Sequence, residues 1–341
     1  MSGRRTHKHT TRTVGATAVA VVVAGTVAAC GSASGGAPAG AGGSSWKPSQ
    51  TVHMDVPFAP GGGSDVFGRA IAQGFEKVRP GLNVTVQNRA GGSGAVGYTF
   101  LYSKKGDPYY LLPSETTAVA LPLATKTPWK WTSFTPIMQV AEDTSLLLVP
   151  TDSPYKSLKD VIAAAKHGKH LRIGVTGTLS IDAIQVALME KDAGIQLRRV
   201  VFESGGEMIT GLLGGNVDMG MLNPSEGIEQ VKAGKVRGIA VFSDHRYKRP
   251  PINKVPTAKE QGVDVSVGQY RGLFAAGDLT DAQIKYWVQT ARKWTQSPSF
   301  KKYIKQNHLR KVIRPHDEFV PYLHTYDSTI KKALKASGGL K

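Results

Sequence analysis

Two glycine-rich segments contain the residues whose types and spacing could bind a ligand. Residues 60–65 read PGGGSD, and residues 88–94 read NRAGGSG. Each segment follows a strand-like hydrophobic run and precedes the start of a helical pattern. The first N–H groups of a helix are unpaired and point outward, and glycine lets a ligand approach the backbone closely. The two segments therefore predict an anion site, and we expect carboxylate oxygens to bind there.

The polar residues around these loops each have two interpretations. Asp65 stands where the N-cap of a helix belongs, but it could instead order a water molecule or a substrate amine or hydroxyl. An arginine fork suits a carboxylate, yet Arg69 and Arg89 could equally stabilise the loops. Glu115 follows a further strand and would repel an anion unless it faces away or burial protonates it. The spacing alone leaves these alternatives open.

The segments that must position these loops alternate between strands and helices. Strand-like runs occupy residues 52–58, 83–87, 109–113, 171–175, 200–202, 217–221 and 236–242, with further runs within 135–149. Helical patterns lie between them, residues 121–134 are irregular, and the chain becomes helical from residue 280. This alternation predicts parallel sheets in an α/β architecture, which bind ligands at the carboxyl ends of their strands. Both glycine loops lie at such ends, as do the polar turns 114–117 and 176–180.

The composition is that of a globular protein with a basic balance. The chain has 341 residues, enough for two domains with separate cores, and 40% of them are hydrophobic and 20% charged. A net charge of +18 admits nucleic acid, an anionic membrane surface or an acidic ligand as the partner. The basic residues are scattered and form no RNP, zinc-finger or basic-zipper pattern, so we expect no nucleic acid.

The first 45 residues predict export and attachment to a membrane. Residues 1–13 are basic and polar, residues 14–29 are small and apolar, and the single cysteine, Cys30, follows them. This order is typical of a lipoprotein signal peptide, residues 1–29, after whose removal Cys30 carries the lipid anchor. Residues 30–45 have the composition of a flexible tether. We therefore expect the protein on the extracellular face of the cytoplasmic membrane, exported by the Sec or the Tat route.

Six short motifs resemble, in order, those of one known family. They are residues 57–65, 88–97, 212–218, 232–237, 256–262 and 270–274. The set is similar to that of the solute-binding proteins of tripartite tricarboxylate transporters, the TctC or Bug family, over about residues 50–340. The resemblance implies an α/β, two-lobed, periplasmic-binding-protein-like (type II) fold with a ligand cleft between the lobes. It places lobe 1 at residues 46–150 plus 268–341 and lobe 2 at residues 151–267.

The resemblance also implies which residues hold the solute, because family members bind carboxylates largely through main-chain N–H groups and ordered waters in the two glycine loops. The predicted ligand-binding residues are Gly62, Gly63, Ser64, Asp65, Gly92, Ser93, Gly94, Ala95, Glu115, Thr116, Thr178 and Ser180. Tyr270 and Arg271, at the return to lobe 1, could close the cleft or act in the hinge. Residues 88–92, Glu115 and Leu179 depart from the commoner family pattern, which leaves the identity of the carboxylate open.

The function implied by the resemblance is capture of a small di- or tricarboxylate between the lobes. The solute would then be delivered to two integral membrane subunits of a tripartite tricarboxylate transporter. The positive net charge would modestly assist the capture of anions, and we expect a monomer. The alternative is an exported ligand-binding protein that reports to a membrane sensor kinase.

The sequence contains no convincing enzyme, cofactor or metal motif. It has no G-x-S-x-G or S-x-x-K motif, and no nucleophile–base pair can be named. Gly92, Gly94 and Gly97 fit G-x-G-x-x-G, but Glu115 lies in a turn beyond its strand, where it does not suit a dinucleotide. His167 and His170 lack a third ligand for a metal. We therefore expect no catalytic residue, no cofactor and no metal.

Overall fold

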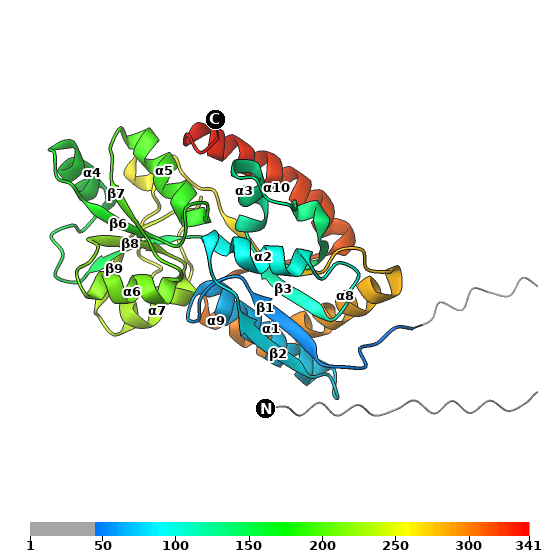
Figure 1. The fold of residues 1–341 in the computed structure, drawn as a ribbon. Coiled ribbons are helices and arrows are strands. Elements are labelled where there is room, and N and C mark those ends of the chain that lie inside the picture. Colours follow the sequence, from blue (N-terminus) through cyan, green and yellow to red (C-terminus); the bar gives the residue numbers. More distant parts are fainter. Residues whose placement is uncertain (1–44, 341) are drawn as a thin grey trace, which may run out of the picture. The chain divides into compact units, whose positions relative to one another are not determined.

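The computed structural model describes residues 45–340 of the chain. The predicted signal peptide, Cys30 and the tether up to residue 44 lie outside the described residues. Within residues 45–340, no helix is both long and apolar enough to span a bilayer. Two sheets organise this part of the chain (Figure 1). We call the six-stranded sheet and its helices the first domain, and the five-stranded sheet and its helices the second domain.

The sheet of the first domain combines parallel and antiparallel strands. In sheet order they are β11 (Arg310–Pro315), β4 (Thr135–Asp143), β10 (Gln269–Ala275), β3 (Tyr110–Ser114), β1 (Val52–Val56) and β2 (Val84–Asn88). β1 runs parallel to β2 and β3, whereas β10 is antiparallel to β3 and β4. The prediction of parallel sheets was therefore wrong for this half. β10 enters from the second domain, so no crossover helix sets its direction.

Helices cover both faces of this sheet. One face packs against α1 (Gly63–Val78), α8 (Asp281–Gln296) and α9 (Pro298–Gln306), and the other against α2 (Ala95–Tyr102), α3 (Thr117–Ala124) and α10 (His316–Ala336). Side chains alternate along a strand, so Leu111 packs in the first cluster and Leu112 in the second. The end of α3 lies in the segment 121–134, which was expected to be irregular. The helix extends into it despite Pro122 because its residues 117–121 are buried and their packing stabilises this short helix.

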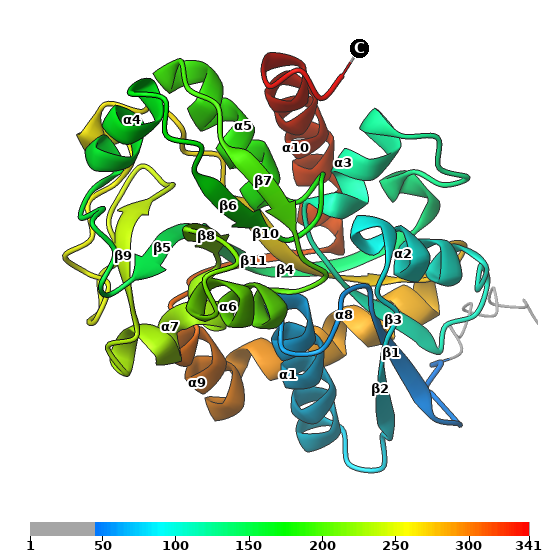
Figure 2. The same ribbon diagram turned by 60° about the vertical axis from the view of Figure 1, so that its left-hand side comes forward.

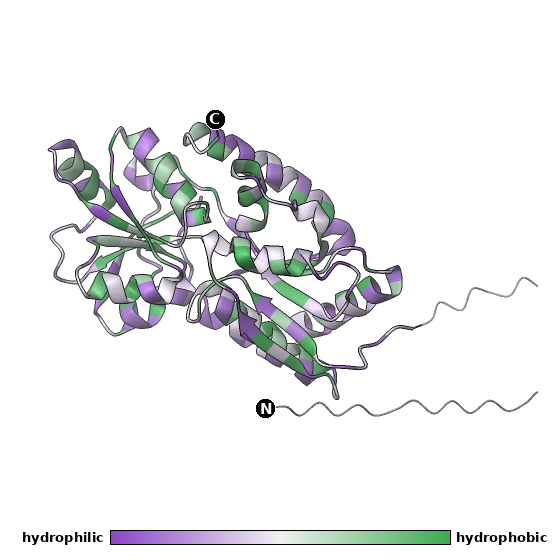
Figure 3. Ribbon diagram, viewed as in Figure 1, coloured by the Kyte–Doolittle hydropathy of each residue, from purple (hydrophilic) through white to green (hydrophobic). Residues whose placement is uncertain are grey.

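The second domain repeats this layered arrangement with a smaller sheet. Its strands, in sheet order, are β7 (Arg198–Val201), β6 (Arg172–Val175), β8 (Met219–Leu222), β5 (Leu146–Pro150) and β9 (Val236–Val241). β5 is antiparallel to both its neighbours, so this sheet is mixed as well. Its helices are α4 (Leu158–Lys166) and α5 (Ile181–Ala193) on one face, and α6 (Gly205–Leu213) and α7 (Pro224–Lys232) on the other. In Figure 3 the helices alternate hydrophobic and hydrophilic residues, as expected for elements with one buried face.

The chain passes between the domains in both directions. It leaves the first sheet after β4 and enters the second at β5, so the crossing is residues 144–145, earlier than the predicted boundary after residue 150. It returns after β9 through residues 242–268. The domains also touch directly: α5 lies beside α10 (Figure 2), and Ile184 of α5 is buried in a cluster of the first domain.

Candidate functional site

Loops at one edge of each sheet meet around a small cavity between the two domains. They follow the carboxyl ends of β1, β3, β6, β7 and β8, and the start of the antiparallel β10 reaches the same place. The lining residues are Phe58, Gly62, Gly63, Ser64, Glu115, Thr176, Ser180, Ile181, Asp182, Ser204, Gly205, Asn223, Glu226, Gln269 and Arg271. The cavity volume is about 20 Å³, room for roughly one water molecule. A solute of several carbon atoms can enter only if the two domains move apart.

The first glycine loop presents a backbone donor to the second domain. Gly62 is the N-cap of α1, and the N–H of Gly63 donates a hydrogen bond of 2.8 Å to Oε1 of Glu226. Glu226 lies in the first turn of α7, and its Oε2 accepts the N–H of Asn223 at 2.8 Å. A carboxylate of the protein itself therefore occupies the helix N-terminus that the sequence predicts as a carboxylate site.

The carboxylate of Asp65 is engaged in hydrogen bonds within and beside the same loop. Its carboxylate accepts hydrogen bonds from Arg69, Asn88 and the N–H of Gly61. Burial by itself would raise the pKa of Asp65, but these hydrogen bonds and the charge of Arg69 outweigh it and lower the pKa. Arg69 thus stabilises the loop, one of the two alternatives that its position left open. The expectation that Asp65 is the N-cap was wrong, because the N-cap of α1 is Gly62 and Asp65 lies in the first turn of the helix.

A buried guanidinium lies under the first loop. Arg271 is 1% exposed, and its Nη2 lies 2.7 Å from Oδ2 of Asp143 and its Nη1 3.1 Å from Oε2 of Glu115. Oε2 of Glu115 also accepts the hydroxyl of Ser64 at 3.2 Å. A Cβ added at Gly63 would come within 2.6 Å of Nη2 of Arg271, so this position needs glycine for the close approach. The triad of Arg271, Asp143 and Glu115 therefore fixes the floor of the site.

The second domain contributes further acid. Asp182 is 4% exposed and accepts the hydroxyl of Thr176 at 3.0 Å. Burial raises the pKa of Asp182, and it raises the pKa of Glu226 to about 7 despite the hydrogen bonds from Gly63 and Asn223. Burial also raises the pKa of Glu115, although Arg271 opposes the shift. The lining thus contains three carboxyl groups and one guanidinium.

The second glycine loop meets the second domain by a different contact. Oγ of Ser93 accepts the N–H of Thr178 at 2.9 Å and lies 3.3 Å from its hydroxyl. Ser93 has a φ of 57° and Gly94 a φ of 95°, so the loop needs residues that tolerate the left-handed region. Ser93 and Thr178 therefore close one side of the domain interface without lining the cavity themselves.

The structure brings together only part of the predicted set. Five predicted residues line the cavity: Gly62, Gly63, Ser64, Glu115 and Ser180. The others lie outside its lining: Asp65, Gly92, Ser93, Gly94, Ala95, Thr116 and Thr178. Thr116 is buried and its hydroxyl bonds to that of Tyr326 at 2.7 Å. That these twelve residues bind the ligand stays a prediction.

Several lining residues were not singled out from the sequence. They are Asp182, Ser204, Asn223, Glu226 and Gln269. Asp182 and Glu226 stand in the first turn of a helix, where an acidic side chain interacts favourably with the helix dipole. That local signal indicates a helix start and does not reveal which carboxylates face the other domain.

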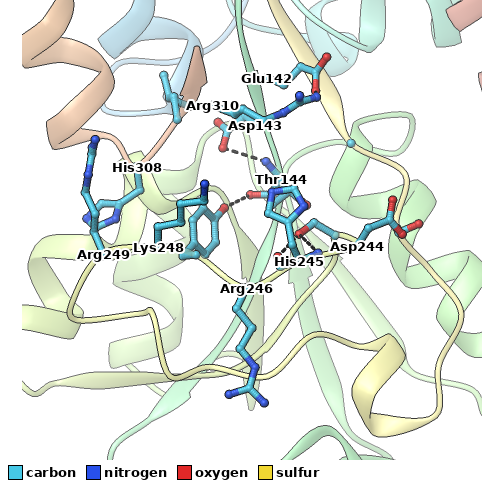
Figure 4. Close-up of a pocket in the computed structure, with 15 residues that line it drawn as sticks. Glu142, Asp143, Thr144, Asp244, His245, Arg246, Lys248, Arg249, His308 and Arg310 are labelled. Carbon is cyan, nitrogen blue, oxygen red and sulfur yellow. Dashed lines mark hydrogen bonds and ion pairs between the residues drawn. The ribbon is translucent and has the colours of Figure 1, made fainter. Parts of the chain in front are cut away.

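A second, larger cavity lies where the chain crosses between the domains (Figure 4). It has a volume of about 630 Å³ and is lined by residues from the end of β4, from 243–249, from 266–268 and from 308–310. None of the predicted site residues lines it. Its charged groups are partly paired already, Arg310 with Glu142 and Arg246 with Glu260. This cavity belongs to the hinge side, and the small cavity to the side where the loops converge.

Potential metal ligands are not clustered within residues 45–340. Within residues 45–340, no group of three or more histidine, cysteine, aspartate or glutamate side chains is arranged to hold a metal ion. The acidic groups of the small cavity are instead held by hydrogen bonds and by Arg271.

The chain is similar to known proteins over most of its length. A family model described as "Tripartite tricarboxylate transporter family receptor" matches residues 67–329. Protein BugT of Bordetella pertussis is 29% identical over 220 residues, which cover 63% of this chain and 67% of BugT.

Solved structures agree in fold. The structure of the periplasmic binding protein BugD superposes with a TM-score of 0.81 at 23% identity, covering 86% of this chain and 100% of BugD. The R. palustris protein Rpa4515, solved with adipate, gives a TM-score of 0.80 at 23% identity over 85% of this chain and 98% of that one. These matches confirm the predicted two-lobed periplasmic-binding-protein-like fold.

Proposed function

The chain belongs to the tripartite tricarboxylate transporter receptor (TctC) family, and on that premise we propose that it captures a small carboxylate-bearing solute between its two domains and delivers it to the membrane subunits of such a transporter. The family assignment confirms the resemblance seen in the sequence. Members of this family are periplasmic solute-binding proteins, and this chain is a solute-binding protein rather than an enzyme.

One contact carries the proposal. The N–H of Gly63, at the start of α1, holds a carboxylate oxygen of Glu226 at 2.8 Å across the domain interface. The same donor is available to a carboxylate of the solute once the domains separate and Glu226 leaves. The adipate in the R. palustris relative supports a carboxylate as the ligand.

Capture then follows from domain movement. The cavity of about 20 Å³ admits no such solute while the domains are closed, so binding requires opening. A solute carboxylate would replace Glu226 at Gly63, and the domains would close around it. We further propose that the closed form docks on two integral membrane subunits, with the protein held at the membrane by a lipid on Cys30 and acting as a monomer.

A melting-temperature screen of the purified chain tests this function. The panel is citrate, tricarballylate, C4 and C6 dicarboxylates, amino acids, aromatic carboxylates and NAD. A ligand at 100 times its dissociation constant stabilises the fold by about 2.7 kcal/mol, which shifts the melting temperature by several degrees. At least one carboxylate is expected to give this shift, and NAD none.

One variant tests the site and another controls for it. Gly62→Asp places a carboxylate at an N-cap, where aspartate is favourable, so that it competes with the solute for the N–H groups of the loop. Ser297→Asp makes the corresponding change at the N-cap of α9. The carboxylate-induced shift should vanish in Gly62→Asp and persist in Ser297→Asp. A panel in which no carboxylate shifts the wild-type melt contradicts the proposed function.

A further inference from the structure

The small cavity between the domains carries more negative than positive charge. Glu115, Asp182 and Glu226 line it, and Arg271 is the sole cation among the lining residues. Arg271 is already bound by Asp143 and Glu115, so its charge is taken up within the floor of the site. Asp182 and Glu226 are the two carboxyl groups of the lining that are not paired with Arg271. A dianion placed in the cavity would add two negative charges beside them.

The hydrogen-bond partners of Asp182 and Glu226 in the described part of the chain are all neutral. Asp182 accepts from the backbone N–H and the hydroxyl of Thr176. Glu226 accepts from the backbone N–H groups of Gly63 and Asn223. Neither forms an ion pair with a lysine, arginine or histidine within residues 45–340. Enclosed carboxyl groups in this situation gain from a cation or a proton.

A second observation indicates that a ligand is meant to complete this site. Gln269 is 2% exposed and lines the same cavity, yet its Nε2 has no hydrogen-bond partner. A buried amide donor without a partner is costly, and a ligand oxygen would satisfy it. The cavity therefore offers acceptors for a positively charged nitrogen and donors for an oxygen, at Gln269 and at Gly63.

We infer that the solute is an amino acid, which carries an ammonium group for Asp182 and Glu226 as well as a carboxylate for the N–H of Gly63. This inference rests on the proposed function. When the solute enters, its carboxylate takes the Gly63 donor from Glu226, and the released Glu226 faces the ammonium group. A zwitterion leaves the net charge of the site unchanged, whereas a plain di- or tricarboxylate makes it more negative.

Pairs of solutes that differ only in one amino group test the inference. Titration calorimetry of the purified chain at pH 8 compares aspartate with succinate, glutamate with glutarate, and norleucine with hexanoate. At least one amino member should bind 10-fold or more tightly than its partner without the amino group. Equal or tighter binding of the plain carboxylates overturns the inference and leaves the proposed function standing. Failure of all six compounds to bind overturns the inference, and the melting-temperature panel then decides whether the proposed function stands.

Neutral isosteres locate the ammonium site. Glu226→Gln and Asp182→Asn remove a charge without changing shape, and each should reduce the preference for the amino member at least 5-fold. Glu229→Gln on the same helix α7 and Asp192→Asn on α5 remove exposed charges and should leave the preference unchanged. Circular dichroism confirms that each variant is folded. A preference that survives in both Glu226→Gln and Asp182→Asn overturns the assignment of these residues.

Discussion

The two glycine loops have similar sequences but use their backbone donors differently. In the first loop, the N–H of Gly63 is directed across the domain interface to a carboxylate. In the second, the N–H groups of Gly94 and Val96 both bond to the carbonyl of Gly91, within the loop itself. A short 3-10 turn, η1 (Gly92–Gly94), precedes α2 and consumes these donors. The first loop therefore presents a backbone donor to the other domain, whereas the N–H groups of Gly94 and Val96 are satisfied within the second loop.

The loops also differ in what lies beneath them. The first rests on the buried triad of Arg271, Asp143 and Glu115, to which Ser64 is bonded. The second meets the turn after β6 through a single serine, at a partly exposed position. The first loop should therefore be sensitive to substitution and the second tolerant.

The largest expected effect is the loss of the guanidinium under the first loop. Arg271→Met leaves Asp143 and Glu115 enclosed without a counter-charge, which should lower the free energy of unfolding by about 3–5 kcal/mol. Urea denaturation measures the change. Arg246→Met breaks an exposed pair with Glu260 and should cost at most about 1 kcal/mol. Similar losses in the two variants would show that the buried triad contributes no more to stability than an exposed ion pair.

The next largest effect comes from adding a methyl group, which should affect the two loops differently. Gly63→Ala places a Cβ 2.6 Å from Nη2 of Arg271, which should cost about 1–3 kcal/mol and abolish ligand-induced stabilisation. In Gly94→Ala, the φ of 95° strains the backbone by about 1–2 kcal/mol, but ligand-induced stabilisation should remain. Thermal melts with and without ligand measure both quantities. The reverse pattern would assign ligand binding to the second loop.

The pH dependence of stability isolates Glu226. Its pKa rises from 4.5 to about 7 on folding, so the folded state binds the proton more tightly than the unfolded state. The contribution of Glu226 to the free energy of unfolding is therefore most favourable below about pH 4.5. It falls as the pH rises toward 7, by on the order of 1 kcal/mol or more. Burial is the main cause of this raised pKa and Asp182 adds to it, whereas the hydrogen bonds from Gly63 and Asn223 and the charge of Arg271 oppose it. The difference in unfolding free energy between wild type and Glu226→Gln should thus change across pH 4.5–7. A constant difference contradicts the shift.

The smallest expected effect belongs to the second loop. Ser93→Ala removes one hydrogen bond to Thr178 and should lower the free energy of unfolding by about 0.5–1.5 kcal/mol. Ligand affinity should change less than 3-fold, because Ser93 does not line the cavity. Titration with the best ligand of the panel measures this. A loss of affinity of 10-fold or more would show that the second loop contributes to ligand binding.

Much of the fold was predictable because its signals are local. The sequence predicts that the chain becomes helical from residue 280, and in the structure a capping box starts α8 there, with the hydroxyl of Thr280 accepting the N–H of Gln283. Helix α7, residues 224–232, lies between the predicted strands 217–221 and 236–242, where the sequence predicts a helix. The strands β10 and β11 were not predicted, and neither was the antiparallel direction of β5. Strand direction depends on where the chain returns from, which no short window of sequence contains.

The candidate site was predictable only in part, for the same reason. Gly63 and Ser64 were identified from the loop pattern, and Glu115 from its turn. Asp182 and Glu226 looked like ordinary residues of a first helical turn. Gly63 and Glu226 meet across 163 residues of chain, and that contact exists only when both domains are folded and closed.

The sequence by itself determined the loops, the helix starts and the family, because glycine, capping residues and ordered motifs act within a few neighbouring positions. The tertiary structure decided which backbone donors face the other domain, and it gathered three carboxyl groups around one guanidinium. The physical reason is that charge and hydrogen bonding in a cleft are properties of the groups that meet there. In this protein those groups come from turns after five strands and from the start of a sixth.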